Sequence, residues 1–188
     1  MKRLEEMNAA RCSSTLSCRQ FIWILAEDSD HIDLELESLL KCAKIPFIYF
    51  AYGPTRNYGN AQKNALLQFV ADLTRSFKFH ANVHPIDDDG YGLAEGYELC
   101  YGIKKFGLLP IVAVGLPEDM EYAAIENGKV VIHGGWPERA FPFDYNMMIF
   151  NSSLFDKFDA DATLFWPHPG RGGESEFAER HLDSIQEI

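Results

Sequence analysis

The sequence has little of what several protein classes need. Its four cysteines are scattered among 188 residues without a Cys-x-x-Cys pair, so they predict neither a zinc knuckle nor a disulfide scaffold and favour a reducing compartment. No stretch approaches the roughly 18 uninterrupted apolar residues of a membrane span. Residues 1–20 carry charges where a signal peptide is apolar. We therefore expect a cytoplasmic protein.

Basic residues are scarce as well. The chain has 17 Lys and Arg against 28 Asp and Glu, a formal net charge of -11. Nucleic acids and anionic membranes need a basic face, so neither is expected as the main partner. A small anionic ligand needs only a few local donors, such as backbone N–H groups at a helix start and one or two arginines. The composition thus leaves a small phosphorylated ligand open.

Apolar runs of strand length alternate with amphipathic stretches of helix length, a pattern typical of an α/β domain with a mostly parallel sheet. We predict a three-layer Rossmann-like sandwich over residues 21–188, preceded by an arm or frayed helix at 1–20. The predicted strands are 21–26, 46–51, 79–86, 109–114 and 162–166, and the predicted helices are 32–43, 60–77, 93–106, 143–158 and 175–188. Asn127-Gly128 predicts an antiparallel hairpin within 122–133.

Two glycine-rich turns follow predicted strands. The first supplies a hydroxyl, a guanidinium and a carboxamide, and comprises Gly53, Pro54, Thr55, Arg56 and Asn57; the second opens a helix and comprises Gly170, Arg171, Gly172, Gly173 and Glu174. Such turns collect backbone N–H groups and a positive helix end at one point, which suits a phosphate. After parallel strands both turns would lie on one edge of the sheet, so one ligand could contact both.

From Pro46 onward the chain resembles the LOG and SLOG group of Rossmann-like proteins, which includes lysine decarboxylase-like nucleoside-monophosphate phosphoribohydrolases and nucleotide-ligand sensors. Four segments carry the resemblance in family order: the turn at 53–57, Gly90-Tyr91-Gly92-Leu93, the strand and turn at 111–117, and the strand at 161–166 with its glycine turn. The resemblance implies nucleotide binding at Gly90, Gly92 and the two turns, no cofactor, and a homodimer.

The resemblance also implies cleavage of an N-glycosidic bond, in which a carboxylate assists an oxocarbenium-like sugar. Glu176, at the end of the terminal motif, is the leading catalytic residue, and Arg171 and Arg56 would hold phosphate. The terminal turn is one glycine short and has Gly173 where the family has threonine. The predicted helix at 143–158 contains no arginine, whereas the family has its catalytic arginine there. Asn151 and Lys157 are the nearest polar candidates for its place. A non-catalytic nucleotide sensor is therefore the main alternative.

Two further groups of residues support other hypotheses about the catalytic site. Glu98-Leu99-Cys100-Tyr101-Gly102 is similar to the nucleophile helix of nucleoside 2-deoxyribosyltransferases, which makes Glu98 and Glu95 catalytic candidates. Carboxylates and a histidine at Asp28, Asp30, His31 and Asp33, with the acids at 87–89, could bind Mg²⁺ or Mn²⁺ and support a metal-dependent phosphoesterase. Helix capping and solvated acids explain the same residues without a metal.

Overall fold

The computed structural model describes residues 21–56, 59–88, 94–112, 120–157 and 173–188. Its first part is a strand–helix–strand–helix unit: β1 (Trp23–Glu27), α2 (Leu34–Cys42), β2 (Phe47–Ala51) and α3 (Asn60–Phe77). β1 and β2 pair in parallel, with Trp23 opposite Phe47 and Glu27 opposite Ala51. The Asp33 side chain caps α2 by accepting from two backbone N–H groups. These elements agree with the strands and helices expected for residues 21–77.

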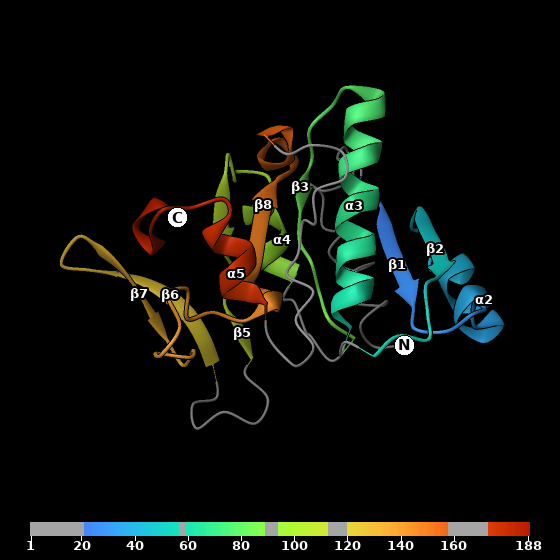
Figure 1. Ribbon diagram of the computed structural model, residues 1–188, viewed down its shortest axis with the longest axis horizontal. Helices are drawn as coiled ribbons and strands as arrows, with labels where there is room; N and C mark the ends of the chain where they lie inside the picture. Colours follow the sequence, from blue (N-terminus) through green and yellow to red (C-terminus); the bar gives the residue numbers. More distant parts are fainter. Residues whose placement is uncertain (1–20, 57–58, 89–93, 113–119, 158–172) are drawn as a thin grey trace.

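The second part is antiparallel. β3 (Asn82–Val83) and β4 (Phe106–Leu108) flank β8 (Met148–Asn151) in one sheet, and α4 (Ala94–Cys100) lies between β3 and β4 in the chain. A second sheet has the order β5 (Ile111–Val112), β6 (Met120–Glu126) and β7 (Lys129–His133). In Figure 1, β8 and α5 (Glu174–Glu179) lie between the β6–β7 hairpin at one end and β1, β2 and α2 at the other.

The hairpin prediction is confirmed. β6 and β7 pair antiparallel from Tyr122 opposite His133 to Glu126 opposite Lys129. Asn127 and Gly128 form the turn with φ values of 50° and 75°. Positive φ at both central residues is the geometry for which an Asn-Gly pair is favoured, because it matches the twist of the two strands.

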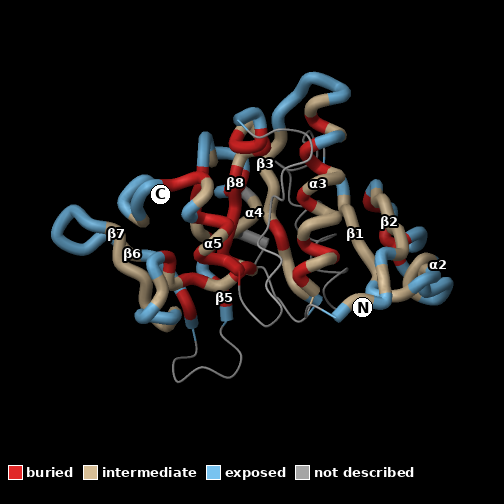
Figure 2. Tube along the Cα trace, viewed as in Figure 1, coloured by how far each residue is buried: buried red, intermediate tan, exposed pale blue. Residues whose placement is uncertain are grey.

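The core is built around β8. The three residues Met148, Ile149 and Phe150 are 0% exposed. The Phe150 ring contacts three other core rings, those of Phe106, Phe155 and Phe177, at centroid distances of 6.1, 5.6 and 5.2 Å. Figure 2 shows β8 buried, whereas β1 and β2 are of intermediate burial throughout. The apolar centre of the described structure is therefore antiparallel.

The prediction of a three-layer Rossmann-like sandwich with a mostly parallel sheet is wrong. In the described residues only β1 and β2 pair in parallel, and the other pairings are antiparallel. The segment at 143–158 is not a helix: a 3₁₀ turn (Tyr145–Met147) leads into β8, and a second 3₁₀ helix (Ser152–Lys157) follows it. A strand buried on both faces is apolar at consecutive positions, so its period does not separate it from a buried helix.

Other predicted elements also differ from the expectation. The strand at 79–86 is reduced to Asn82–Val83, and the helix at 93–106 ends at Cys100. In the strand predicted at 109–114, the described residues Ile111 and Val112 pair antiparallel with β6. The predicted closing helix at 175–188 stops after Glu179, and a 3₁₀ helix (Ile185–Glu187) capped by Ser184 follows. The expected strand at 162–166 and the arm at 1–20 lie outside the described residues.

None of the described helices is both long and apolar enough to cross a membrane.

Candidate functional site

The turn after β2 is held against the end of β1 by Asp28. Asp28 Oδ1 accepts hydrogen bonds from the Thr55 backbone N–H at 2.7 Å and from Gln62 Nε2 at 2.6 Å. A Cβ on Gly53 would lie 2.4 Å from Asp28 Oδ1 and 2.7 Å from the Asp28 backbone carbon, so only glycine allows this approach. Gly53 and Thr55 thus have a structural role, whereas Arg56 is exposed.

The acidic segment at 28–33 does not gather into a metal site. Asp28 bonds to the turn, Asp30 pairs with His31 at 2.6 Å, and Asp33 caps α2. No group of three or more His, Cys, Asp or Glu side chains in the described ranges could hold a metal ion. Of these residues Asp33 has the expected capping role, and the described residues do not supply the ligand set of the metal-dependent phosphoesterase.

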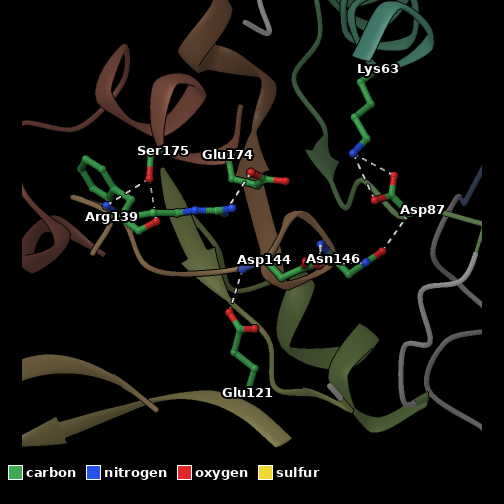
Figure 3. Close-up of polar contacts among 9 residues, drawn as sticks. Lys63, Asp87, Glu121, Arg139, Asp144, Asn146, Glu174 and Ser175 are labelled. Atoms are coloured by element: carbon green, nitrogen blue, oxygen red, sulfur yellow. Dashed lines mark hydrogen bonds and ion pairs between the residues drawn. The ribbon is translucent and has the colours of Figure 1, made fainter. Parts of the chain in front are cut away.

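A cluster of charged side chains lies instead between α3, β6 and α5 (Figure 3). Lys63, in the first turns of α3, is 11% exposed, and its Nζ contacts the Asp87 carboxylate at 3.0 and 3.1 Å. The same ammonium lies 4.0 Å from the centroid of the Tyr145 ring. Burial raises the pKa of Tyr145 well above its ordinary value, and the negative charges of Asp87 and Glu174 add to this effect.

Glu174 is the first residue of α5 and faces the interior. Gly173 precedes it with a φ of 117°, a left-handed conformation that favours glycine over the family's threonine. Glu174 is 7% exposed and accepts from Arg139 Nη1 at 3.2 Å. Burial raises the pKa of the Glu174 carboxyl, while Lys63 and Arg139 nearby act to lower it. Burial and the two cations thus act on the Glu174 carboxyl in opposite directions, and burial has the larger effect.

Arg139 is held in place from two sides. Its guanidinium lies over the Trp136 ring, 4.9 Å from the centroid. Two residues further on, the Phe141 backbone N–H donates to Ser175 Oγ at 3.3 Å, and Ser175 Oγ donates to the Phe141 carbonyl at 2.8 Å. These bonds fasten the 139–141 segment to α5, beside Glu174 (Figure 3).

The remaining members of the cluster connect β6 to Asp87. Glu121 Oε1 accepts from the Asp144 backbone N–H at 2.7 Å. Asp144 Oδ1 accepts from the backbone N–H and from Nδ2 of Asn146, both at 2.8 Å. Asn146 Oδ1 in turn accepts from the Asp87 backbone N–H at 2.7 Å. Burial raises the pKa of Glu121 to about 7.

Several predicted site residues lie outside the described residues: Asn57, Gly90, Gly92, Gly170, Arg171 and Gly172. Residues within or beside these turns do come together. Lys63 follows the turn at 53–57, Asp87 precedes the turn at 90–93, and Glu174 is the last residue of the turn at 170–174. Tyr145 lies within electrostatic reach of both acids. Whether the three turns themselves form one site stays a prediction, because most of their residues lie outside the described ranges.

Other predicted residues have different places. Glu176 is only partly buried and lies two residues beyond Glu174, the buried acid of α5. Asn151 in β8 donates to Asn82 Oδ1 at 2.8 Å and accepts from the Ser153 backbone N–H, so it joins β8 to β3. Glu95 and Glu98 lie in α4, and the structure does not describe their side chains.

Sequence reasoning missed Lys63, Glu121, Arg139 and Asp144. One signal could have found Lys63, because it shares a helical face with Leu67, Val70, Ala71 and Thr74, all of them buried. A lysine on the apolar face of a helix is rarely buried unless it is paired. Glu121 and Arg139 have no comparable signal, since strand pairing and ring stacking bring them to the cluster.

The described fold defines a mixed α/β protein with one parallel pair and two small antiparallel sheets. Comparison with models of protein families and with curated proteins finds no match. The resemblance to the LOG and SLOG group therefore stays a prediction.

Proposed function

We propose that this protein binds a nucleotide or nucleoside monophosphate at the charged cluster formed by Lys63, Asp87, Arg139, Tyr145 and Glu174. The observation that carries the proposal is that Lys63, Asp87 and Glu174, which come from separate parts of the chain, lie around one buried residue, Tyr145. Lys63 and Arg139 come from separate elements and are the two cations of the cluster that a phosphate would contact, in exchange for their present partners Asp87 and Glu174.

The same cluster supports a hydrolytic reaction on the ligand. Glu174 replaces Glu176 as the leading carboxyl, because Glu174 is buried and its pKa is raised by that burial. A protonated Glu174 would donate its proton to a ring nitrogen of the base as the C–N bond breaks, the bonding electron pair leaving with the base. Water would then add to C1′ of the sugar and return a proton to the carboxylate. The products are a free base and a sugar phosphate.

A non-catalytic nucleotide sensor is the second candidate. The predicted helix at 143–158, in which the resemblance places a catalytic arginine, instead contains the strand β8, whose residues 148–150 are fully buried. In addition, Lys63 already has a carboxylate partner in Asp87. Both observations favour a site that binds its ligand and leaves it intact.

The test is a panel of nucleoside 5′-monophosphates assayed by thermal unfolding and by chromatography of products, with EDTA and without added metal. Binding predicts a rise in the unfolding temperature with at least one nucleotide. Free base among the products identifies the hydrolase, and a thermal shift with unchanged nucleotide identifies the sensor. The proposal is wrong if no nucleotide changes the unfolding temperature at millimolar concentration.

Two variants assign the effect to the cluster. Lys63→Met should remove the thermal shift, whereas Lys41→Met, at an exposed lysine paired with Glu37, should leave it unchanged. Glu174→Gln should abolish release of the base while the thermal shift remains. Its control is Glu179→Gln, at an exposed position at the other end of α5. Equal effects of each variant and its control would place the ligand elsewhere.

A further inference from the structure

One continuous path of hydrogen bonds joins strand β6 to helix α3. It runs from Glu121 to the Asp144 backbone N–H, from the Asp144 carboxylate to Asn146, from Asn146 to the Asp87 backbone N–H, and from the Asp87 carboxylate to Lys63 (Figure 3). Every hydrogen bond on this path is 2.7 or 2.8 Å long, and the ion pair that ends it is 3.0 Å long. The position of Asp87, and with it the partner of Lys63, therefore depends on the anchor at Glu121.

Glu121 is an unusual anchor because only one of its two carboxyl oxygens accepts a described hydrogen bond. The residue is 0% exposed, and within the described part of the chain its Oε2 atom has no hydrogen-bond partner. A buried acceptor without a partner costs free energy, and the cost rises sharply when the group is ionised. The charged groups that face Glu121 are Asp144, Arg139 and Glu174, and the two acids oppose its ionisation. A purely structural anchor for one backbone N–H does not require a carboxyl group.

We propose that Glu121 is a positioning residue of the charged cluster, and that its protonation state sets how tightly the cluster binds an anionic ligand. The inference rests on the proposed function for the identity of that ligand. With Glu121 neutral and Glu174 protonated, as in the proposed reaction, Lys63 and Arg139 are opposed by Asp87 and Asp144. Ionised Glu121 adds a further negative charge in the same buried region, which repels a phosphate group and strengthens the pull on the Asp144 backbone N–H.

The direction of the effect follows from this charge balance. Affinity for a phosphate monoester should be highest below neutral pH and should fall as the pH rises through about 7. One additional charge about 10 Å from the ligand, at an effective dielectric constant between those of a protein surface and water, changes affinity by about threefold to tenfold.

The test compares nucleotide dissociation constants at pH 6 and pH 8 by isothermal titration calorimetry for the wild-type protein, Glu121→Gln and Glu126→Gln. Glu126 is exposed on the same strand and pairs with His133, which makes it the matched control. The phosphate group of the ligand titrates identically in all three experiments, so its contribution cancels. The dissociation constant at pH 8 divided by that at pH 6 should be about threefold to tenfold larger for the wild-type protein and Glu126→Gln than for Glu121→Gln. Equal ratios would overturn the inference.

A second measurement needs no ligand and keeps this inference separate from the proposed function. The backbone amide resonances of Asp87 and Asn146 should titrate together with a midpoint near 7 in the wild-type protein and in Glu126→Gln, because Glu121 reaches both through Asp144. In Glu121→Gln the titration should disappear. Resonances that stay constant in the wild-type protein, or that titrate equally in Glu121→Gln, contradict the positioning role. Titration without any nucleotide binding would contradict only the proposed function.

Discussion

The parallel β1–β2 unit and the antiparallel sheet around β8 are stabilised in different ways. Every residue of β1 and β2 is of intermediate burial, and the turn that follows β2 is fastened by polar bonds to Asp28. In β8 the residues 148–150 are 0% exposed, and aromatic rings surround them. The β1–β2 unit, whose elements follow local sequence rules, therefore contributes less to the buried core than the antiparallel sheet around β8 does.

The largest expected effect comes from removing one aromatic ring from each region. Phe150→Ala should lower the free energy of unfolding by about 3–5 kcal/mol, because the ring is fully buried among three others. Phe50→Ala in β2 should cost only about 1–2 kcal/mol, because Phe50 is half-buried against Phe69. Urea unfolding of both variants measures the difference, and equal losses would break the comparison.

Glu121 should make the stability of the protein depend on pH, an effect that the apolar packing of the two regions does not produce. Its pKa is raised by burial from 4.5 to about 7, so the folded state binds a proton that the unfolded state has released. Stability should therefore fall as the pH rises from 4.5 to 7 and should level off above that range. Between pH 5 and 8 the loss due to Glu121 is about 2–3 kcal/mol. Urea unfolding of Glu121→Gln should show a fall smaller by this amount, and an unchanged pH profile would refute the raised pKa.

A smaller effect is expected at the polar fastening of the parallel unit. Asp28→Ala removes the acceptor of the Thr55 N–H and one of the acceptors of Gln62 Nε2, which should cost about 1–2 kcal/mol. Asp30→Ala should be nearly neutral, because the Asp30–His31 pair is exposed on both sides. If thermal unfolding shows the same stability for the two variants, polar bonds are not what holds this turn.

The smallest expected effect lies at the edge of the β6–β7 hairpin. The Gln186 side chain accepts from the Val130 N–H at 2.8 Å and donates to the Val130 carbonyl at 3.0 Å, as a neighbouring strand would. Because this contact is exposed, Gln186→Ala should lower stability by only about 0.5 kcal/mol. Hydrogen exchange of the Val130 amide should nevertheless become faster. Unchanged exchange would mean that Gln186 does not protect this edge.

The contrast between the two regions also explains which elements of the fold can be predicted from the sequence. β1, α2, β2 and α3 follow local rules: short apolar runs, a capping aspartate and a periodic buried face, so their positions were predicted closely. The Asn127-Gly128 turn is equally local. β8 is different, because its run of Met148, Ile149 and Phe150 gains its strand identity from pairing with β3 and β4. Such pairing partners are distant in sequence.

The candidate site shows the same limit. Glu174 belongs to one of the predicted glycine turns, and the apolar face of α3 indicates that Lys63 is buried. Arg139 and Glu121 reach the cluster through the stacking on Trp136 and the bond to Asp144, neither of which leaves a periodic pattern. The catalytic role of Glu176 stays a prediction, and the more buried acid of α5 is Glu174.

The most direct test of the central claim is the affinity of the Lys63→Met protein for the nucleoside monophosphate that gives the largest thermal shift. Calorimetry should show a dissociation constant at least about tenfold higher than in the wild-type protein, the effect of losing one charged contact to phosphate. Lys41→Met should bind as the wild-type protein does. If Lys63→Met and the wild-type protein bind the nucleotide equally well, the cluster around Lys63 and Glu174 is not the binding site.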